Sequence, residues 1–179
     1  MKHLILGGAR SGKSAYAEEQ ALAHGARQHE NQQSSCNFWY VATATLSDDQ
    51  EMKQRIAHHQ QSREGCWQLI EEPLNIAAVI RQHASSSDVI LVDCLTLWLT
   101  NALLNQSWPT DKQAFVEAVA NSSAQLYFVS NEVGSGIVPL GELSRQFVDE
   151  SGWLHQALAK QCEHVSLIVA GLPLALKTP

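Results

Sequence analysis

The clearest chemical signal in the sequence is a glycine-rich octet near its start, Gly7-Gly8-Ala9-Arg10-Ser11-Gly12-Lys13-Ser14. It fits G-x-x-x-x-G-K-[ST] without a mismatch, follows an apolar run and opens a helical pattern, which is the context this motif requires. Glycines let the backbone curl so that several N–H groups point into one concavity, with the positive end of the helix behind them. The octet predicts a nucleoside triphosphate site in which Lys13 reaches the β- and γ-phosphates and Ser14 faces Mg²⁺.

Such a site also needs a carboxylate near the magnesium ion, at the end of a neighbouring buried strand. The run Val89-Ile90-Leu91-Val92-Asp93 offers one. Asp93 could instead serve as the N-cap of the helix that follows. No other strand-length run ends as clearly in an acid, so we expect Asp93, with Ser14, on the metal side of the site.

A second segment with reactive side chains, Asp48–Arg63, has helical periodicity. His59 shares its apolar face with Met52 and Ile56, whereas His58 is turned away. An imidazole beside the guanidinium that ends this segment could act on a phosphate, as nucleophile or proton carrier. A histidine on an apolar face is also often a packed core residue, and the spacing by itself leaves both interpretations open.

Composition and charge narrow the classes of partner. The chain has 179 residues, of which 45% are hydrophobic and 17% charged, and its net charge is −6. This length allows one domain with a substantial core. The basic residues are scattered, so no run of lysine and arginine predicts a nucleic-acid or membrane surface. A polyanionic substrate must therefore be held by local devices rather than by a broad positive field.

Cysteine usage and apolar runs favour a cytoplasmic protein. The four cysteines form no C-x-x-C pair and match no zinc spacing, so we expect reduced thiols. The apolar run at the N-terminus is too short for a signal peptide. The longest apolar stretch, Val89–Leu104, is interrupted by Asp93 and Asn101, which favours a buried strand and a helix over a membrane span.

Apolar runs of strand length alternate with segments of helical length. The expected strands are His3–Leu6, Phe38–Ala42, Trp67–Ile70, Val89–Val92, Leu126–Ser130 and Val165–Ala170. The expected helices are Lys13–His24, Asp48–Arg63, Leu74–His83, Leu95–Leu104, Thr110–Gln125 and Gly141–His164, the last with a candidate break at Ser151-Gly152. The polar segment Gly25–Asn37 reads as a loop. The alternation predicts one α/β domain over residues 1–179, with a mainly parallel sheet covered by helices on both faces.

Taken together, these motifs resemble the bifunctional adenosylcobinamide kinase / adenosylcobinamide-phosphate guanylyltransferase family of cobalamin biosynthesis. The resemblance covers nearly the whole chain. Beyond the phosphate loop it is carried by Tyr40-Val41-Ala42-Thr43-Ala44, Asp49-x-Glu51-Met52-x-x-Arg55-Ile56-x-x-His59-x-x-x-Arg63 with Trp67 and Glu71, Asp93-Cys94-Leu95-Thr96 with Thr100-Asn101, and Asn131-Glu132-Val133-Gly134-Ser135-Gly136-Ile137-Val138-Pro139. The phosphate loop alone indicates only a superfamily, whereas the histidine segment and residues 131–139 are specific.

The resemblance implies two reactions. ATP or GTP first phosphorylates adenosylcobinamide. A histidine then attacks the α-phosphate of GTP, giving a GMP-histidine phosphoramidate and pyrophosphate, and adenosylcobinamide phosphate takes the GMP to form adenosylcobinamide-GDP. His59 matches this nucleophile, Lys13 is the second catalytic residue, and the nucleotide contacts fall on the phosphate loop, Thr43, Ala44, Thr45, Gln60, Gln61, Ser62, Arg63, Glu71 and Asp93. The family also implies a RecA-like P-loop sheet and a homotrimer.

The sequence departs from the family's pattern at two places, and two other functions remain as alternatives. The Arg-Pro that follows the family's histidine is Arg63-Glu64 here, and Gly25–Asn37 looks longer than the family needs. The stretch Asn131–Gly134 could be a turn shaped by its glycine, or a contact with substrate or another subunit. The alternative functions are a small-molecule kinase without guanylyl transfer and a RecA-like assembly ATPase, and the lack of a basic patch argues against the latter.

Overall fold

The computed structural model describes residues 1–32, 36–44 and 66–179 of the chain. The helix expected over Asp48–Arg63 therefore lies outside the described residues. Within the described ranges, no helix is both long enough and apolar enough to cross a membrane.

Seven strands form one sheet, in the order β3-β2-β4-β5-β1-β6-β7. Their bounds are β1 (Lys2–Gly7), β2 (Asn37–Ala42), β3 (Trp67–Glu71), β4 (Asp88–Asp93), β5 (Gln125–Asn131), β6 (His164–Val169) and β7 (Leu172–Lys177). The pairings from β3 through β6 are all parallel, and only β7 runs antiparallel to its neighbour β6. The predicted mainly parallel α/β sheet is confirmed. Central strands buried on both faces explain the unbroken apolar runs of β1, β4 and β5.

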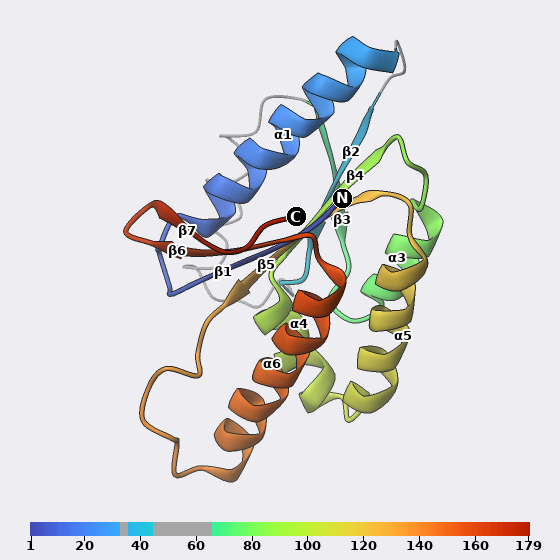
Figure 1. Cartoon of the computed structure of the whole chain (residues 1–179). Helices are drawn as coiled ribbons and strands as arrows, with labels where there is room; N and C mark the ends of the chain where they lie inside the picture. Colours follow the sequence, from blue (N-terminus) through green and yellow to red (C-terminus); the bar gives the residue numbers. More distant parts are fainter. Residues whose placement is uncertain (33–35, 45–65) are drawn as a thin grey trace.

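Helices cover both faces of this sheet, as predicted (Figure 1). Helix α1 (Lys13–Gln32) packs on β1, β4 and β5 from one side. The other side carries α3 (Ile76–Gln82), α4 (Leu95–Leu104), α5 (Trp108–Asn121) and α6 (Glu142–Gln161). Successive residues of β1 serve the two layers in turn, because strand side chains alternate between faces. Leu4 and Leu6 join the core under α4–α6, and Ile5 joins the core under α1.

Helix α1 is longer than expected, because it continues through Gly25 to Gln32 where the sequence suggested a loop. The glycine serves packing rather than a turn. A Cβ at Gly25 would lie 2.2 Å from the ring of Phe38, so only glycine lets the helix pass that close to β2. Helix α6 likewise runs without a break through Ser151-Gly152, and Ser151 is buried. Of these small residues, Gly25 marks a close approach between elements, whereas a Cβ at Gly152 would meet no atom within 4 Å.

Two further differences concern strands. Helix α5 ends at Asn121, four residues before the expected Gln125, because Gln125 already pairs with Val89 as the first residue of β5. Strand β7 was not predicted. It follows a two-residue turn in which Ala170 and Gly171 both have positive φ, 52° and 80°, the geometry that joins antiparallel strands tightly.

Candidate nucleotide site

The predicted site residues that the structure describes gather along one edge of the sheet. Parallel strands end at the same edge, and ligands of open α/β sheets bind outside these carboxyl ends. The phosphate loop follows β1, Thr43 follows β2, Asp93 ends β4, and Asn131 ends β5. Thr45, His59, Gln60, Gln61, Ser62 and Arg63 lie outside the described residues, as does His58.

The phosphate loop has the tight curvature that its glycines predict. Gly12 adopts a φ of 93°, in the region that glycine enters at little cost, and Arg10 has a φ of 56°. A Cβ at Gly7 would lie 2.5 Å from the Ser11 hydroxyl and 2.7 Å from the backbone oxygen of Ile168, so the loop can fold back only over glycine. The loop is also tied to the β6–β7 turn, because the Gly171 N–H donates to the Ser11 carbonyl at 2.8 Å.

Two polar groups in the loop fit an anionic ligand. The side chain of Lys13 is 9% exposed, and its ammonium donates to the Gly8 carbonyl at 3.0 Å, which holds the charge across the loop. The buried hydroxyl of Ser11 finds no hydrogen-bond partner among the described residues. Ser14 lies half-buried in the first turn of α1. A buried cation and an unsatisfied donor are what phosphate oxygens would complete.

Asp93 is not the N-cap of α4, because Cys94 occupies that position. The Asp93 carboxylate accepts a hydrogen bond of 2.6 Å from the Tyr40 hydroxyl. Burial and the charge of Asp93 raise the pKa of the Cys94 thiol, while Lys13 opposes them from the phosphate loop. Lys13 therefore lies within electrostatic reach of the end of β4, although β5 separates β4 from β1 in the sheet.

Thr43 forms a closed lock between the ends of β2 and β4. It is fully buried, and its hydroxyl donates to the Cys94 carbonyl at 2.7 Å and accepts from the Cys94 N–H at 2.9 Å. Its N–H donates to the Asp93 carbonyl, and its own carbonyl accepts from the Asn101 side chain. The hydroxyl, N–H and carbonyl of Thr43 are thus all engaged within the protein, where they hold the ends of β2 and β4 together. A direct contact between Thr43 and a nucleotide stays a prediction, as does one from its half-buried neighbour Ala44.

Glu71 ends β3, the outermost strand on this side, and is exposed. The order β3-β2-β4-β5-β1 puts three strands between Glu71 and the strand that carries the phosphate loop. At about 4.8 Å per strand, the separation across the sheet is roughly 19 Å. A nucleotide that reached both would have to lie along the edge, with its phosphates at the loop and its nucleoside toward Glu71.

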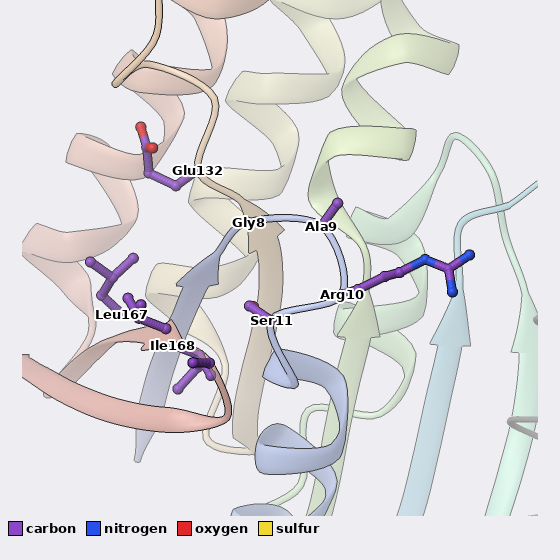
Figure 2. Close-up of a pocket in the computed structure, with 9 residues that line it drawn as sticks. Gly8, Ala9, Arg10, Ser11, Glu132, Leu167 and Ile168 are labelled. Carbon is purple, nitrogen blue, oxygen red and sulfur yellow. The ribbon is translucent and has the colours of Figure 1, made fainter.

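The sequence marked the stretches Asp93–Thr96 and Asn131–Gly134 through the family resemblance, without giving Thr96, Asn131 or Glu132 a role of its own. The Asn131 side chain donates to the Thr96 hydroxyl at 3.2 Å, and Thr96 is also hydrogen-bonded to the Cys94 sulfur. Glu132 lines a hollow of about 410 Å³ together with Gly8–Ser11 and the apolar residues Leu167–Ala170 (Figure 2). Asn131 ends the buried strand β5 and Glu132 directly follows it, whereas Thr96 lies in the first turn of α4.

Comparison with known proteins gives a consistent result. The family model described as "Cobinamide kinase / cobinamide phosphate guanyltransferase" matches residues 3–176. The chain is 48% identical over 180 residues to the "Bifunctional adenosylcobalamin biosynthesis protein CobP" of Pseudomonas aeruginosa, covering 99% of this chain and 98% of that protein. It is 33% identical over 193 residues to the CobU protein of the same description from Escherichia coli, and 34% identical to that of Salmonella typhimurium. Each of these two alignments covers 99% of this chain and 100% of the relative.

Proposed function

The chain belongs to the cobinamide kinase / cobinamide phosphate guanyltransferase family, and from this premise we propose how its residues divide the two reactions. It is a bifunctional enzyme of cobalamin biosynthesis, a cobinamide kinase and a cobinamide phosphate guanylyltransferase. The finer proposal is that the acceptors are adenosylcobinamide and its phosphate. ATP or GTP feeds the kinase step, and GTP supplies the guanylyl group.

The observation that carries the kinase assignment is the phosphate loop with its buried Lys13. The ammonium is held over the Gly8 carbonyl, so a bound triphosphate would place its β- and γ-phosphates against it. Backbone N–H groups of residues 7–12 and the N-terminus of α1 would hold the remaining phosphate charge. Phosphoryl transfer needs mainly this positioning and charge, which supports the loop as the kinase centre.

We propose Ser14 and Asp93 as the protein groups on the magnesium side. Mg²⁺ in phosphate sites usually takes one or two carboxylates, directly or through water, together with phosphate oxygens and water, so this donor set fits. A bound Mg²⁺ would neutralise charge that develops on the phosphates. The hydrogen bond from Tyr40 would orient the Asp93 carboxylate toward that role.

His59 is the proposed nucleophile of the guanylyltransferase. An imidazole nitrogen would attack the α-phosphorus of GTP, the bond to the pyrophosphate oxygen would break, and pyrophosphate would leave. Cobinamide phosphate would then displace the imidazole and take the GMP. Support comes from the family match and from the four-residue spacing of His59 and Arg63 in the sequence. Gln60–Arg63, Thr43–Thr45 and Glu71 are the proposed contacts for this nucleotide.

Label transfer tests this proposal. The chain is incubated with GTP labelled at the α-phosphate and denatured, and the protein-bound label is measured. We expect acid-labile, base-stable label on the native chain and on His58→Ala, and none on His59→Ala. His59→Ala should still phosphorylate cobinamide. Label retained by His59→Ala, or lost instead from His58→Ala, would contradict the assignment. A native chain that phosphorylates cobinamide yet never carries GMP would favour a kinase without guanylyl transfer.

We also propose that the chain forms a homotrimer. The segment between β5 and α6 exposes apolar side chains, with Ile137 98% exposed and Leu140 97% exposed. The segment projects from the rest of the molecule (Figure 1). Exposed apolar side chains on such a segment are typical of contact surfaces. The mass in solution should correspond to a trimer, and an Ile137→Ser, Leu140→Ser double variant should dissociate more readily. A native chain that stays monomeric at millimolar concentration would exclude this assembly.

A further inference from the structure

Glu132 is a half-buried carboxylate that the proposed mechanism leaves unused. It follows Asn131, whose Cα pairs with that of Gly7, the first residue of the phosphate loop. The Glu132 N–H donates to the Gly7 carbonyl at 3.1 Å, so its backbone is tied to that loop. Its position relative to the phosphates is thus set by the sheet and not by a free loop.

The Glu132 side chain stands at the rim of the hollow beside the phosphate loop (Figure 2). Gly8 lines the same hollow, and the Gly8 carbonyl is the group that holds the Lys13 ammonium. Since that ammonium contacts the β- and γ-phosphates in P-loop enzymes, a terminal phosphate bound here would lie toward the Gly8 side of the hollow that Glu132 lines. The opposite wall, Leu167–Ala170, is mainly apolar and could seat a bulky acceptor.

One carboxylate oxygen is anchored and the other is available. Oε1 accepts a hydrogen bond of 2.7 Å from the Gly134 N–H. Glycine at 134 leaves room for this contact, because a Cβ there would lie 3.2 Å from Oε1. Within the ranges that the structure describes, no second hydrogen bond and no lysine or arginine ion pair reaches the carboxylate. Figure 2 shows the side chain of Arg10 directed away from Glu132.

A titratable neighbour of Glu132, His155, does not neutralise its charge. His155 of α6 is hydrogen-bonded to the Ser130 hydroxyl at 2.8 Å. Burial lowers the pKa of His155, and the charge of Glu132 only partly opposes this, so the imidazole is neutral at pH 7. A carboxylate beside a polyanion site, without a cationic partner, is costly unless it has a proton to accept or a metal to bind.

We propose that Glu132 is the catalytic base of the kinase step. The acceptor hydroxyl of cobinamide donates to the free carboxylate oxygen and attacks the γ-phosphorus. As the new oxygen–phosphorus bond forms, the bond from the γ-phosphorus to the bridging oxygen breaks and the nucleoside diphosphate leaves. The hydroxyl proton passes to Glu132, which later releases it to water.

This assignment rests on the proposed function, and it separates the two reactions. A hydroxyl must lose a proton when it becomes a phosphate ester. The acceptor of the guanylyl step is already a phosphate anion and has no such proton to lose. Glu132 should therefore matter for phosphorylation of cobinamide and not for guanylylation of cobinamide phosphate.

The test compares Glu132→Gln with the native chain and with Glu142→Gln, which removes an exposed carboxylate from the start of α6. The glutamine oxygen can still accept from the Gly134 N–H, so the local structure is retained while the base is lost. General-base catalysis contributes about 10²–10⁴-fold, so we expect the kinase kcat to fall at least roughly 100-fold. The nucleotide KM, the protein-bound label from α-labelled GTP and the guanylylation of cobinamide phosphate should stay within about threefold of native. Glu142→Gln should resemble the native chain throughout.

Three results would overturn the proposal. The kinase kcat of Glu132→Gln could stay near the native value. The nucleotide KM could rise while kcat is kept, which would make Glu132 a nucleoside contact. Both activities could fall together in a folded variant, which would make Glu132 a general structural or metal-side residue. In each case the native chain still phosphorylates cobinamide, whereas failure of the proposed function would show as a native chain that does not.

Discussion

The two ends of the carboxyl edge of the sheet are built by opposite means. At β1 the phosphate loop is built mainly from backbone, and Gly8, Ala9 and Arg10 are exposed to solvent. At β2 and β4 the edge is closed by side chains, with Thr43 hydrogen-bonded to both backbone groups of Cys94. The first region presents donors to a ligand, and the second has already satisfied its donors internally.

This difference separates binding from stability. A group that waits for a ligand contributes little to folding, because its partner is absent until the nucleotide arrives. A group that is satisfied inside the protein contributes to folding, because removing it leaves a buried partner without a hydrogen bond. Substitutions at the phosphate loop should therefore act on rates, and substitutions at the Thr43 lock should act on the free energy of unfolding.

The largest effect expected is that of Lys13→Ala on the kinase rate. Loss of a charge aimed at the transferred phosphoryl group should lower kcat/KM by about 10³-fold. The melting temperature should change little without nucleotide. Initial rates of cobinamide phosphorylation and a thermal melt check both parts. Unchanged phosphorylation would mean that the phosphate loop does not take part in the kinase step. A large drop in melting temperature would mean that Lys13, like Thr43, mainly stabilises the fold.

Thr43→Val should act in the opposite way. Valine keeps the shape but leaves the N–H and carbonyl of Cys94 without their Thr43 partner, at a cost of about 2–3 kcal/mol in the free energy of unfolding. Denaturant unfolding measures this loss. Thr100→Val is the control, because the exposed Thr100 hydroxyl only bonds back to the Thr96 carbonyl of its own helix. Equal, small losses in the two variants would mean that the lock is not structural.

A pair of glycine variants examines the phosphate loop from within. Gly7→Ala should destabilise the protein by about 1–3 kcal/mol, because the new Cβ meets the fixed carbonyl of Ile168. Gly8→Ala finds no atom within 4 Å of its new Cβ, so its effect on unfolding should be below about 0.5 kcal/mol. Calorimetric unfolding of both variants measures the two changes in stability. Comparable stability of the two would show that the loop rearranges easily.

Asp93→Asn should give the smallest effect on catalysis, and it changes a residue that borders both regions. Asparagine can still accept from the Tyr40 hydroxyl, and Thr43 bonds the backbone of residues 93 and 94, so the lock should survive. A weaker magnesium-side ligand should raise the Mg²⁺ concentration for half-maximal rate roughly tenfold in both reactions. Magnesium titrations of the two activities measure this change. Curves that overlay those of the native chain would assign Asp93 to the closed region alone.

Much of the fold was predictable because its signals are local. The apolar runs of β1, β4, β5 and β6 mark strands buried on both faces, and α4 has the predicted bounds, Leu95–Leu104. The phosphate loop was predictable for the same reason, since its backbone geometry requires glycine at particular positions within eight residues. The sequence alone therefore determined the fold class, the triphosphate loop and the family resemblance.

Tertiary structure decided what depends on neighbours far apart in the chain. The sheet order puts β5 between β1 and β4, and this brings Glu132 beside Gly8 across more than a hundred residues of sequence. The same order lets Thr43 close on Cys94, and it sets Gly25 against Phe38 so that α1 continues where a loop was expected. Local sequence carries no signal for such pairings, because strand order follows from which faces can be buried together.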